Sequence, residues 1–282
     1  MSLLRGVRRI DPDRSASMGA SLMRRAGPWL PEHKVGRANL AAAFPEKSAD
    51  DIEQLLLEVW DGLGRLGAEY AHLDRIWDYD PNRPAQGRIE IPGDSVANVT
   101  KLKEDGRPGL LFAAHFGNWE LSAVALKTLG LDTAIFYRNP NNQVVASALR
   151  ELREGRMGSL IPAGFRAPAL MTAALDRGHH VGMLVDQHFT RGIDVMFFGR
   201  RCKANPLVAR LAQRYDCPIH GARVVRLPGE RFRVEFTDAL EPARDASGRI
   251  EIAGTMQRIM DVIEGWVREA PEQWLWLHRR WR

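Results

Sequence analysis

The chain has few cysteines and no long apolar runs. Its 282 residues include two cysteines, Cys202 and Cys217, whose spacing matches no metal or redox motif, so we expect two reduced thiols of a cytosolic protein rather than a disulfide framework. No uncharged run approaches the roughly 18–20 apolar residues that cross a bilayer. The start of the chain is basic but has neither the apolar core nor the cleavage site of a signal peptide. These absences argue against a disulfide-rich exported domain and against a transmembrane protein.

Internal repeats, low-complexity segments and linkers are also missing, which predicts a single domain over residues 1–282. A composition with 45% hydrophobic and 27% charged residues can bury a large α/β core. No zinc-binding spacing such as His-Glu-x-x-His is present, so no metal site is expected. A metal-dependent hydrolase stays an alternative whose ligands would be His115, His179, His180, Asp186 and His188.

Positive charge is concentrated at the start of the chain. The formal net charge is +5, and residues 1–40 carry eight Lys/Arg against three acids, so the remainder is neutral. Within this region, residues 15–30 place apolar side chains at helical intervals beside Arg24 and Arg25. We therefore interpret residues 1–34 as an amphipathic basic segment that associates with an anionic membrane surface. A non-catalytic binder of membranes or nucleic acid stays an alternative function.

Tryptophans and arginines crowd the end of the chain. Four of the eight tryptophans fall in the last seventeen residues, at positions 266, 274, 276 and 281, beside four arginines. Such a mixture suits the headgroup layer of an anionic bilayer, or stacking on single-stranded nucleic acid, and it equally suits a buried core. The hypothesis carried forward is that both ends of the chain together hold the protein on anionic membranes.

The periodicity of apolar residues predicts a mixed β-sheet flanked by helices, behind a helical N-terminal region. A helix is expected over residues 50–70. The turn signal at residues 227–230 predicts that the last two strands are antiparallel. Strands are expected at residues 110–114, 133–137, 181–185, 219–225 and 231–236.

A histidine and a glutamate flank a short turn after the first of these strands. Five apolar residues precede His115, a Gly-Asn pair follows, and Glu120 opens an apolar helix-like run. In a continuous helix, side chains five residues apart diverge by about 140°. If His115 instead ends a strand and Asn118 caps the next helix, Glu120 can reach back to the imidazole as a catalytic partner. The alternative is a purely structural histidine at the end of a strand.

Two further strands end in polar residues. The strand at residues 133–137 delivers Arg138 and Asn142, and the strand at residues 181–185 delivers Asp186 and Gln187. Carboxyl ends of parallel strands share one edge of a sheet, so we expect these side chains near His115. Between these strands, Arg150, Arg153 and Arg156 recur at a spacing that stacks them along one helix face.

Four blocks of residues carry a resemblance to the lipid A biosynthesis late (lauroyl/myristoyl) acyltransferase family, with matching order over roughly residues 35–282. The chain lacks the Phe-Pro-Glu-Gly-Thr-Arg block of the glycerolipid acyltransferases, which share the His/Glu dyad, so the lipid A branch is favoured. The blocks are His115-Phe-Gly-Asn-Trp-Glu120, Tyr137-Arg138 with Asn142, Leu184-Val-Asp186-Gln187 followed by Phe197-Phe198-Gly199, and Pro271-Glu-Gln-Trp-Leu-Trp-Leu-His-Arg-Arg280.

The resemblance implies a glycerolipid-acyltransferase-like fold and transfer of a fatty acyl group from acyl carrier protein to a hydroxyl of a hydroxyacyl chain on a lipid A precursor. It implies no cofactor other than the acyl donor. Another glycolipid or a phospholipid stays the alternative acceptor. His115 would be the general base and Glu120 its orienting partner. Substrate binding would fall to Arg138, Asn142, Arg153, Arg156, Asp186 and Gln187.

The resemblance also implies a place in the cell, the cytoplasmic face of the bacterial inner membrane. Most family members begin with an apolar anchoring helix, whereas this chain has only its amphipathic basic start. We therefore expect peripheral or monotopic attachment, with no nucleic-acid partner.

Overall fold

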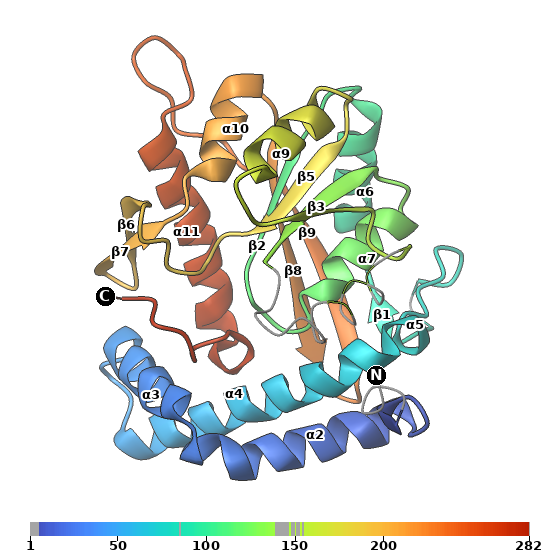
Figure 1. The fold of residues 1–282 in the computed structure, drawn as a ribbon, viewed down its shortest axis with the longest axis vertical. Coiled ribbons are helices and arrows are strands. Elements are labelled where there is room, and N and C mark those ends of the chain that lie inside the picture. The colour runs from blue at the N-terminus through green and yellow to red at the C-terminus, as the bar shows by residue number, and fades with distance from the viewer. Residues whose placement is uncertain are drawn as a thin grey trace.

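A mixed seven-stranded sheet lies at the centre of the computed structural model, which describes residues 6–84, 86–138, 147, 150, 153 and 155–281 (Figure 1). The strand order is β1-β9-β8-β2-β5-β3-β4, in which β8 and β9 are antiparallel and every other neighbouring pair is parallel. The strands are β1 (Ile89–Glu90), β2 (Leu110–Ala113), β3 (Thr133–Tyr137), β4 (Ser159–Pro162), β5 (His180–Leu184), β8 (Ile219–Leu227) and β9 (Arg231–Ala239).

The predicted architecture is confirmed, including the five expected strands and the antiparallel pair at the 227–230 turn. Sequence periodicity missed β1, which has only two residues, and the edge strand β4, in which only one of four residues is buried, so neither forms an apolar run. It also missed a separate antiparallel hairpin of β6 (Ile193–Phe197) and β7 (Arg200–Ala204). In that hairpin, the buried residues Val195, Phe197, Cys202 and Ala204 alternate with exposed or half-buried ones, so each short strand has one buried face.

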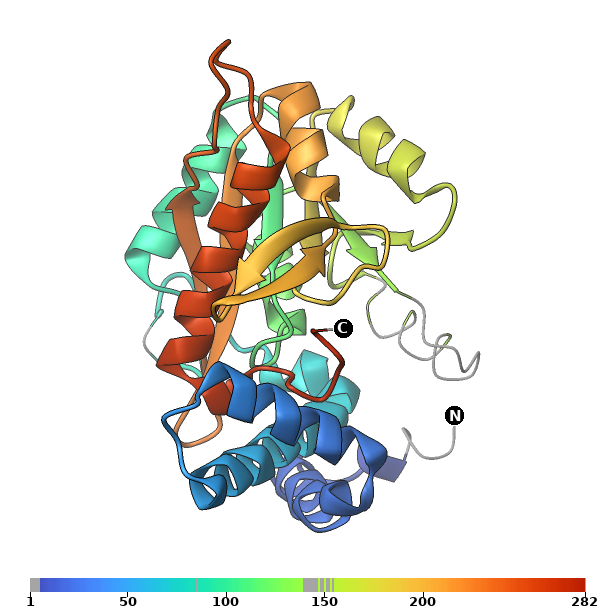
Figure 2. The ribbon, with the colours of Figure 1, turned by 90° about the vertical axis from the view of Figure 1, so that its left-hand side faces the viewer.

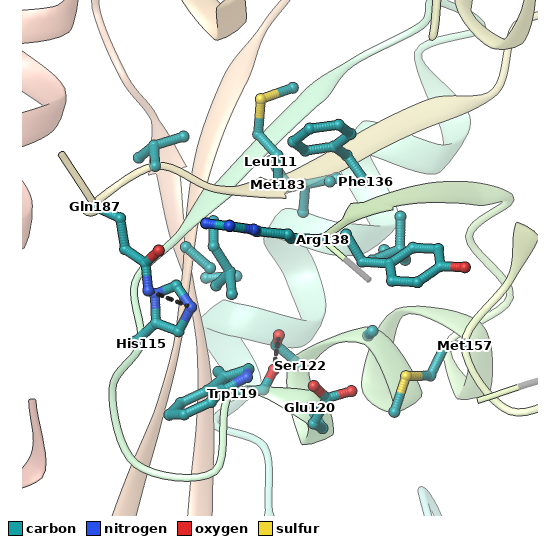
Figure 3. A pocket seen from close by; sticks show the side chains of 18 of the residues that line it. Leu111, His115, Trp119, Glu120, Ser122, Phe136, Arg138, Met157, Met183 and Gln187 are labelled. Atoms are coloured by element: carbon teal, nitrogen blue, oxygen red, sulfur yellow. Dashed lines mark hydrogen bonds between the residues drawn. The ribbon is translucent and has the colours of Figure 1, made fainter. Parts of the chain in front are cut away.

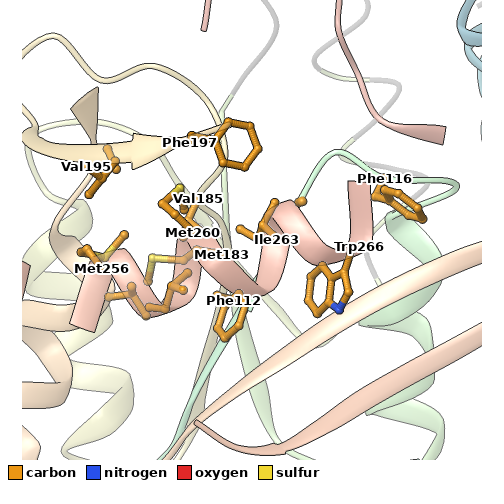
Figure 4. Close-up of a cluster of buried hydrophobic side chains, with 14 of the residues drawn as sticks. Phe112, Phe116, Met183, Val185, Val195, Phe197, Met256, Met260, Ile263 and Trp266 are labelled. Atoms are coloured by element: carbon orange, nitrogen blue, oxygen red, sulfur yellow. The ribbon is translucent and has the colours of Figure 1, made fainter. Parts of the chain in front are cut away.

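Helices cover both faces of the sheet. Strand β2 contributes side chains to the core on each face. Leu110 and Phe112 pack into one core, whereas Leu111 and Ala113 pack into the other, because successive side chains of a strand point to opposite faces. Figure 4 shows α11 lying along the first core. The helices around the sheet are α5 (Leu73–Ile76), α6 (Gly93–Glu104), α7 (Glu120–Thr128), α9 (Ala167–Leu175), α10 (Leu207–Tyr215) and α11 (Ile252–Glu269).

The N-terminal helices gather at one end of the molecule, below the sheet (Figure 2). They are α2 (Pro12–Ala26), α3 (Pro31–Ala43) and α4 (Ala49–Glu69), with short 3-10 turns η1 (Gly27–Trp29) and η2 (Tyr70–His72). A third 3-10 turn, η3 (Pro271–Gln273), follows α11 and contacts α4. Within the described ranges, no helix combines the length and the apolar character needed to cross a membrane.

Two glycines allow α2 and α4 to pack with their backbones in contact. A Cβ atom at Gly64 of α4 would overlap the carbonyl oxygen of Gly19 in α2, and a Cβ at Gly19 would overlap that of Gly64. By contrast, a Cβ at Gly67 of the same helix would meet nothing within 4 Å.

We expect Gly64→Ala to push the two helices apart and to lower the free energy of unfolding by about 1–3 kcal/mol, the usual cost of overpacking. Gly67→Ala is the matched control and should raise stability by about 0.5–1 kcal/mol, because alanine is the better helix former. Urea unfolding of both variants measures the difference. Equal stability of the two variants would contradict close packing at this crossing.

Candidate active site

The three strand ends that carry polar residues meet at one edge of the sheet. Strands β2, β5 and β3 are parallel neighbours in that order, so they bring His115, Asp186 and Arg138 together. This part of the sequence prediction is confirmed. Asn142, also expected there, lies outside the described residues.

His115 and Asp186 form a close pair. The Nδ1 atom of His115 lies 2.8 Å from Oδ1 of Asp186, and the backbone N–H of His115 donates to Oδ2 at 2.9 Å. A third donor is the indole Nε1 of Trp274, 2.8 Å from Oδ2. Burial raises the pKa of the Asp186 carboxyl, but the charge and hydrogen bonds of His115 outweigh it, so the pKa lies well below its ordinary value. Asp186 is therefore a buried, ionised carboxylate.

This carboxylate determines which nitrogen of His115 is available for chemistry. An ionised carboxylate can only accept hydrogen bonds, so the proton of the neutral imidazole is on Nδ1 and the lone pair is on Nε2. The side-chain amide of Gln187 lies 3.3 Å from Nε2 and donates to it. The His115 side chain is 16% exposed, in contrast to 1% for Asp186. The arrangement presents a base whose Nε2 accepts a long hydrogen bond from Gln187, which a substrate hydroxyl can replace, and whose ring is oriented from behind by Asp186.

The structure corrects the expected pairing of His115 with Glu120. Helix α7 begins at Glu120 itself, with Trp119 as its N-cap, after a turn in which Gly117 has a φ of 56°. Asn118 does not cap this helix, and its side chain instead donates to Glu69 at 2.8 Å. Figure 3 shows the Glu120 carboxylate turned away from the imidazole. The orienting carboxylate came from a strand that is distant in sequence, so local spacing did not reveal it.

Glu120 is bound instead by Arg153 and Tyr70. Nε of Arg153 donates to Oε2 of Glu120 at 2.8 Å, Nη2 donates to Oε1, and the Tyr70 hydroxyl donates to Oε1 at 2.7 Å. Burial lowers the pKa of Arg153, but the hydrogen bonds and charge of Glu120 raise it by more. Burial and the nearby Glu120 charge raise the pKa of Tyr70 well above its ordinary value. The three groups form one buried, charge-neutral cluster.

The three arginines expected on one helix face lie in three different environments. Arg150 is exposed, Arg153 is buried against Glu120, and Arg156 lies 3.8 Å from Asp74. Arg153 also lies over the ring of Tyr137, 5.3 Å from its centroid. Of the three, Arg153 is the arginine that contacts the groups of the site.

A cavity of about 560 Å³ opens beside His115 (Figure 3). Its walls are mostly apolar side chains of β2, α7, β3 and β5 with polar groups among them, and Figure 3 shows Arg138 reaching toward Gln187 and His115. Apolar walls with a few converging polar groups are typical of a site for a largely hydrocarbon ligand. The apolar lining residues shown in Figure 3 include Leu111, Phe136, Met157 and Met183.

The C-terminal tryptophans correct a second expectation. Trp266, Trp274 and Trp276 are 7%, 1% and 0% exposed, so they cannot form a membrane-facing surface. The indole N–H groups of two of them form hydrogen bonds within the protein: Trp274 donates to Asp186, and Trp276 donates to the carbonyl of Pro271. Sequence reasoning weighed a core role for these rings but found no signal that one of them reaches the site.

Two basic groups of the same terminal segment lie behind Asp186. Burial lowers the pKa of His278 to about 4, so this imidazole is neutral near pH 7, and its Nδ1 lies 3.0 Å from the carbonyl oxygen of Leu275. Arg280 is fully buried, donates to the carbonyl of Lys203 at 2.8 Å and lies over the ring of Phe197. Among the residues whose placement is described, no group of His, Cys, Asp and Glu side chains could hold a metal ion.

Comparison with known proteins identifies similar sequences. The family model for bacterial lipid A biosynthesis acyltransferase matches residues 13–282. The chain is 24% identical over 274 residues to the lipid A biosynthesis palmitoleoyltransferase of Escherichia coli (strain K12), covering 94% of this chain and 84% of that protein. The lipid A biosynthesis acyltransferase of Shigella flexneri matches with the same figures. A shorter match, 27% identical over 158 residues, covers 20% of acetyl-coenzyme A synthetase 1 of Candida albicans and shows no family relationship.

We expect Glu120→Ala to lower the free energy of unfolding by about 3–5 kcal/mol, because it leaves the buried Arg153 guanidinium without its carboxylate. Combining it with Arg153→Met should recover most of this loss, since an apolar side chain then replaces the stranded charge. Tyr70→Phe removes one hydrogen bond and should cost about 1 kcal/mol. Chemical denaturation of the wild type, Glu120→Ala, Arg153→Met and the double variant measures the coupling. Additive losses from Glu120→Ala and Arg153→Met would contradict a structural ion pair.

Proposed function

Because the chain belongs to the bacterial lipid A biosynthesis acyltransferase family, we propose that it moves a fatty acyl group from acyl carrier protein to a hydroxyl of a hydroxyacyl chain on a lipid A precursor. Family membership already makes it an acyltransferase of lipid A biosynthesis. The proposal adds the donor and the kind of acceptor. The observation that carries it is the His115 imidazole, held by Asp186 through Nδ1 in the wall of a largely apolar cavity.

The reaction needs one base and no protein nucleophile. Nε2 of His115 takes the proton of the acceptor hydroxyl as its oxygen attacks the carbonyl carbon of the thioester. The tetrahedral intermediate then collapses, the C–S bond breaks, and the imidazolium returns its proton to the departing thiolate. Asp186 stabilises the imidazolium and keeps the productive tautomer in place. The products are an ester and a free thiol, and His115 is regenerated.

We assign the binding of negative charge on the substrates and on the tetrahedral intermediate to cationic side chains around the cavity. Arg138 is exposed and lines the cavity on the side of His115, which suits the developing oxyanion or a lipid phosphate. Arg153 is bound to Glu120, so we assign this pair to the polar wall of the cavity rather than to proton transfer. Roles for Asn142 and Arg156 in substrate binding stay predictions. The acyl chain is assigned to the apolar part of the cavity.

Helix α2 is the proposed membrane contact. Its outer face carries Arg14, Met18, Leu22 and Arg25 at helical spacing, and Met18 and Leu22 are 61% and 64% exposed. Trp29, just beyond the helix, is 88% exposed. Apolar side chains flanked by arginines suit the surface of an anionic bilayer. We propose peripheral or monotopic attachment at the cytoplasmic face of the inner membrane.

His115→Ala should lower kcat for carrier-protein-dependent acyl transfer by about 10²–10⁴-fold, because the base is lost. Asp186→Asn should lower it by a similar factor, since the amide no longer selects the Nδ1–H tautomer. The measurement uses an acyl-acyl carrier protein and a lipid A precursor in detergent, with circular dichroism to verify folding. Near-full activity of folded His115→Ala would exclude this mechanism, and equal use of a phospholipid acceptor by the wild type would favour the alternative substrate.

The pair of substitutions Leu22→Glu and Arg25→Glu should weaken binding to anionic vesicles by about tenfold or more at low salt, because each basic residue near such a surface contributes about 1 kcal/mol. Arg177→Glu, an exposed charge reversal beyond α9, is the control and should bind like the wild type. Co-sedimentation with phosphatidylglycerol vesicles measures the effect. Unchanged binding of the α2 variant would show that this helix serves another purpose.

A further inference from the structure

His115 lies between two cavities. The second cavity, of about 450 Å³, is lined by α4, the end of β8 with the turn after it, and η3 with the segment that follows. His115 and Trp119 line both cavities. The His115 side chain therefore lies where the two cavities approach each other.

The hydrogen-bonding groups in the wall of the second cavity are engaged with one another. The Gln273 side chain accepts from the Arg226 backbone N–H at 2.7 Å and donates to the Arg226 carbonyl at 3.0 Å. The Arg226 guanidinium binds Glu69, and the Trp274 N–H binds Asp186. Besides the carboxylates of Glu58, Asp61 and Glu272, which can only accept hydrogen bonds, the remaining wall is hydrocarbon, supplied by Val59, Leu63, Leu66, Leu227, Pro228 and Leu275.

The side chains of this wall determine which part of the donor or the acceptor the second cavity can bind. A pantetheine arm carries two amide carbonyls that need hydrogen-bond donors, and the Arg226, Gln273 and Trp274 donors of this wall are already engaged, so burying those carbonyls here is costly. A phosphate or a phosphorylated sugar would meet the carboxylates of Glu58, Asp61 and Glu272, which also line this cavity. An uncharged alkyl chain meets neither obstacle.

We propose that the second cavity binds the alkyl tail of the acceptor's hydroxyacyl chain. This inference rests on the proposed function, in which the product is a branched ester with two alkyl arms that diverge near one oxygen. The first cavity takes the incoming acyl chain, the second takes the tail of the acceptor chain, and His115 is at the branch point. The acceptor hydroxyl then faces Nε2 from the side opposite to the donor chain.

Gly62 of α4 offers a way to fill the second cavity. It lines the cavity, and a Cβ at this position meets nothing within 4 Å. Gly67 lies on the same helix with the same free space but lines neither cavity, so Gly67→Phe is the matched control for Gly62→Phe. Leu227→Trp fills the cavity from the opposite wall and serves as a second variant.

Binding is measured by calorimetry without turnover, using two probes in detergent. The acceptor probe is N-(3-hydroxytetradecanoyl)glucosamine and the donor probe is dodecanoyl-pantetheine. Gly62→Phe and Leu227→Trp should weaken the acceptor probe by about 10- to 50-fold, the effect of excluding two or three methylenes from an apolar site. Donor binding should stay within about twofold of the wild-type value, and Gly67→Phe should change neither. A 3-hydroxybutanoyl acceptor, too short to enter the cavity, should bind all the proteins alike.

Three other outcomes would contradict either the inference or the proposed function. Weaker donor binding with unchanged acceptor binding would place the donor arm in the second cavity and overturn the inference. Unchanged binding of both probes by both filled variants would show that no substrate occupies the cavity, while the proposed function stands. A wild-type protein that binds neither probe would contradict the proposed function itself.

Discussion

The buried carboxylate of Asp186 is the group on which the rest of the site depends. Removing a carboxylate from water costs several kcal/mol unless donors replace the lost hydration. Here those donors come from the turn after β2 and from the C-terminal segment, since His115 gives a backbone and a ring N–H and Trp274 gives its indole N–H. One side chain thereby joins the end of β5 to two distant segments. The same contacts that satisfy its charge set the tautomer of the base.

The helical N-terminal region is joined to this site by one ion pair and two hydrogen bonds. Glu69, at the end of α4, accepts from Arg226 of β8 and from Asn118 in the turn after β2. The next residue, Tyr70, donates to Glu120, which Arg153 neutralises. These contacts place α4 against the His115 turn, where it forms one wall of the second cavity. Helix α4, on which the proposed membrane-contacting helix α2 packs, thus also forms a wall of the proposed acceptor cavity.

The carboxylates of Asp186 and Glu120 differ in role because their surroundings differ. Asp186 receives hydrogen bonds from groups that do not neutralise it permanently, so its charge is available to a protonated imidazole. Glu120 faces a guanidinium at close range and is already neutralised. Two buried acids near one histidine therefore have different roles, and their neighbours decide which role each has.

The sequence by itself determined the elements and the edge where the site lies. Apolar periodicity located β2, β3, β5, β8 and β9, and polar residues after three of them indicated a shared edge, because these signals are local. Tertiary structure alone decided which groups touch. Asp186 replaced Glu120 as the partner of His115, and Trp274 turned from a possible membrane anchor into a donor to Asp186. Such pairings join residues 71 and 88 positions apart, and no local spacing encodes a contact that depends on how the whole chain packs.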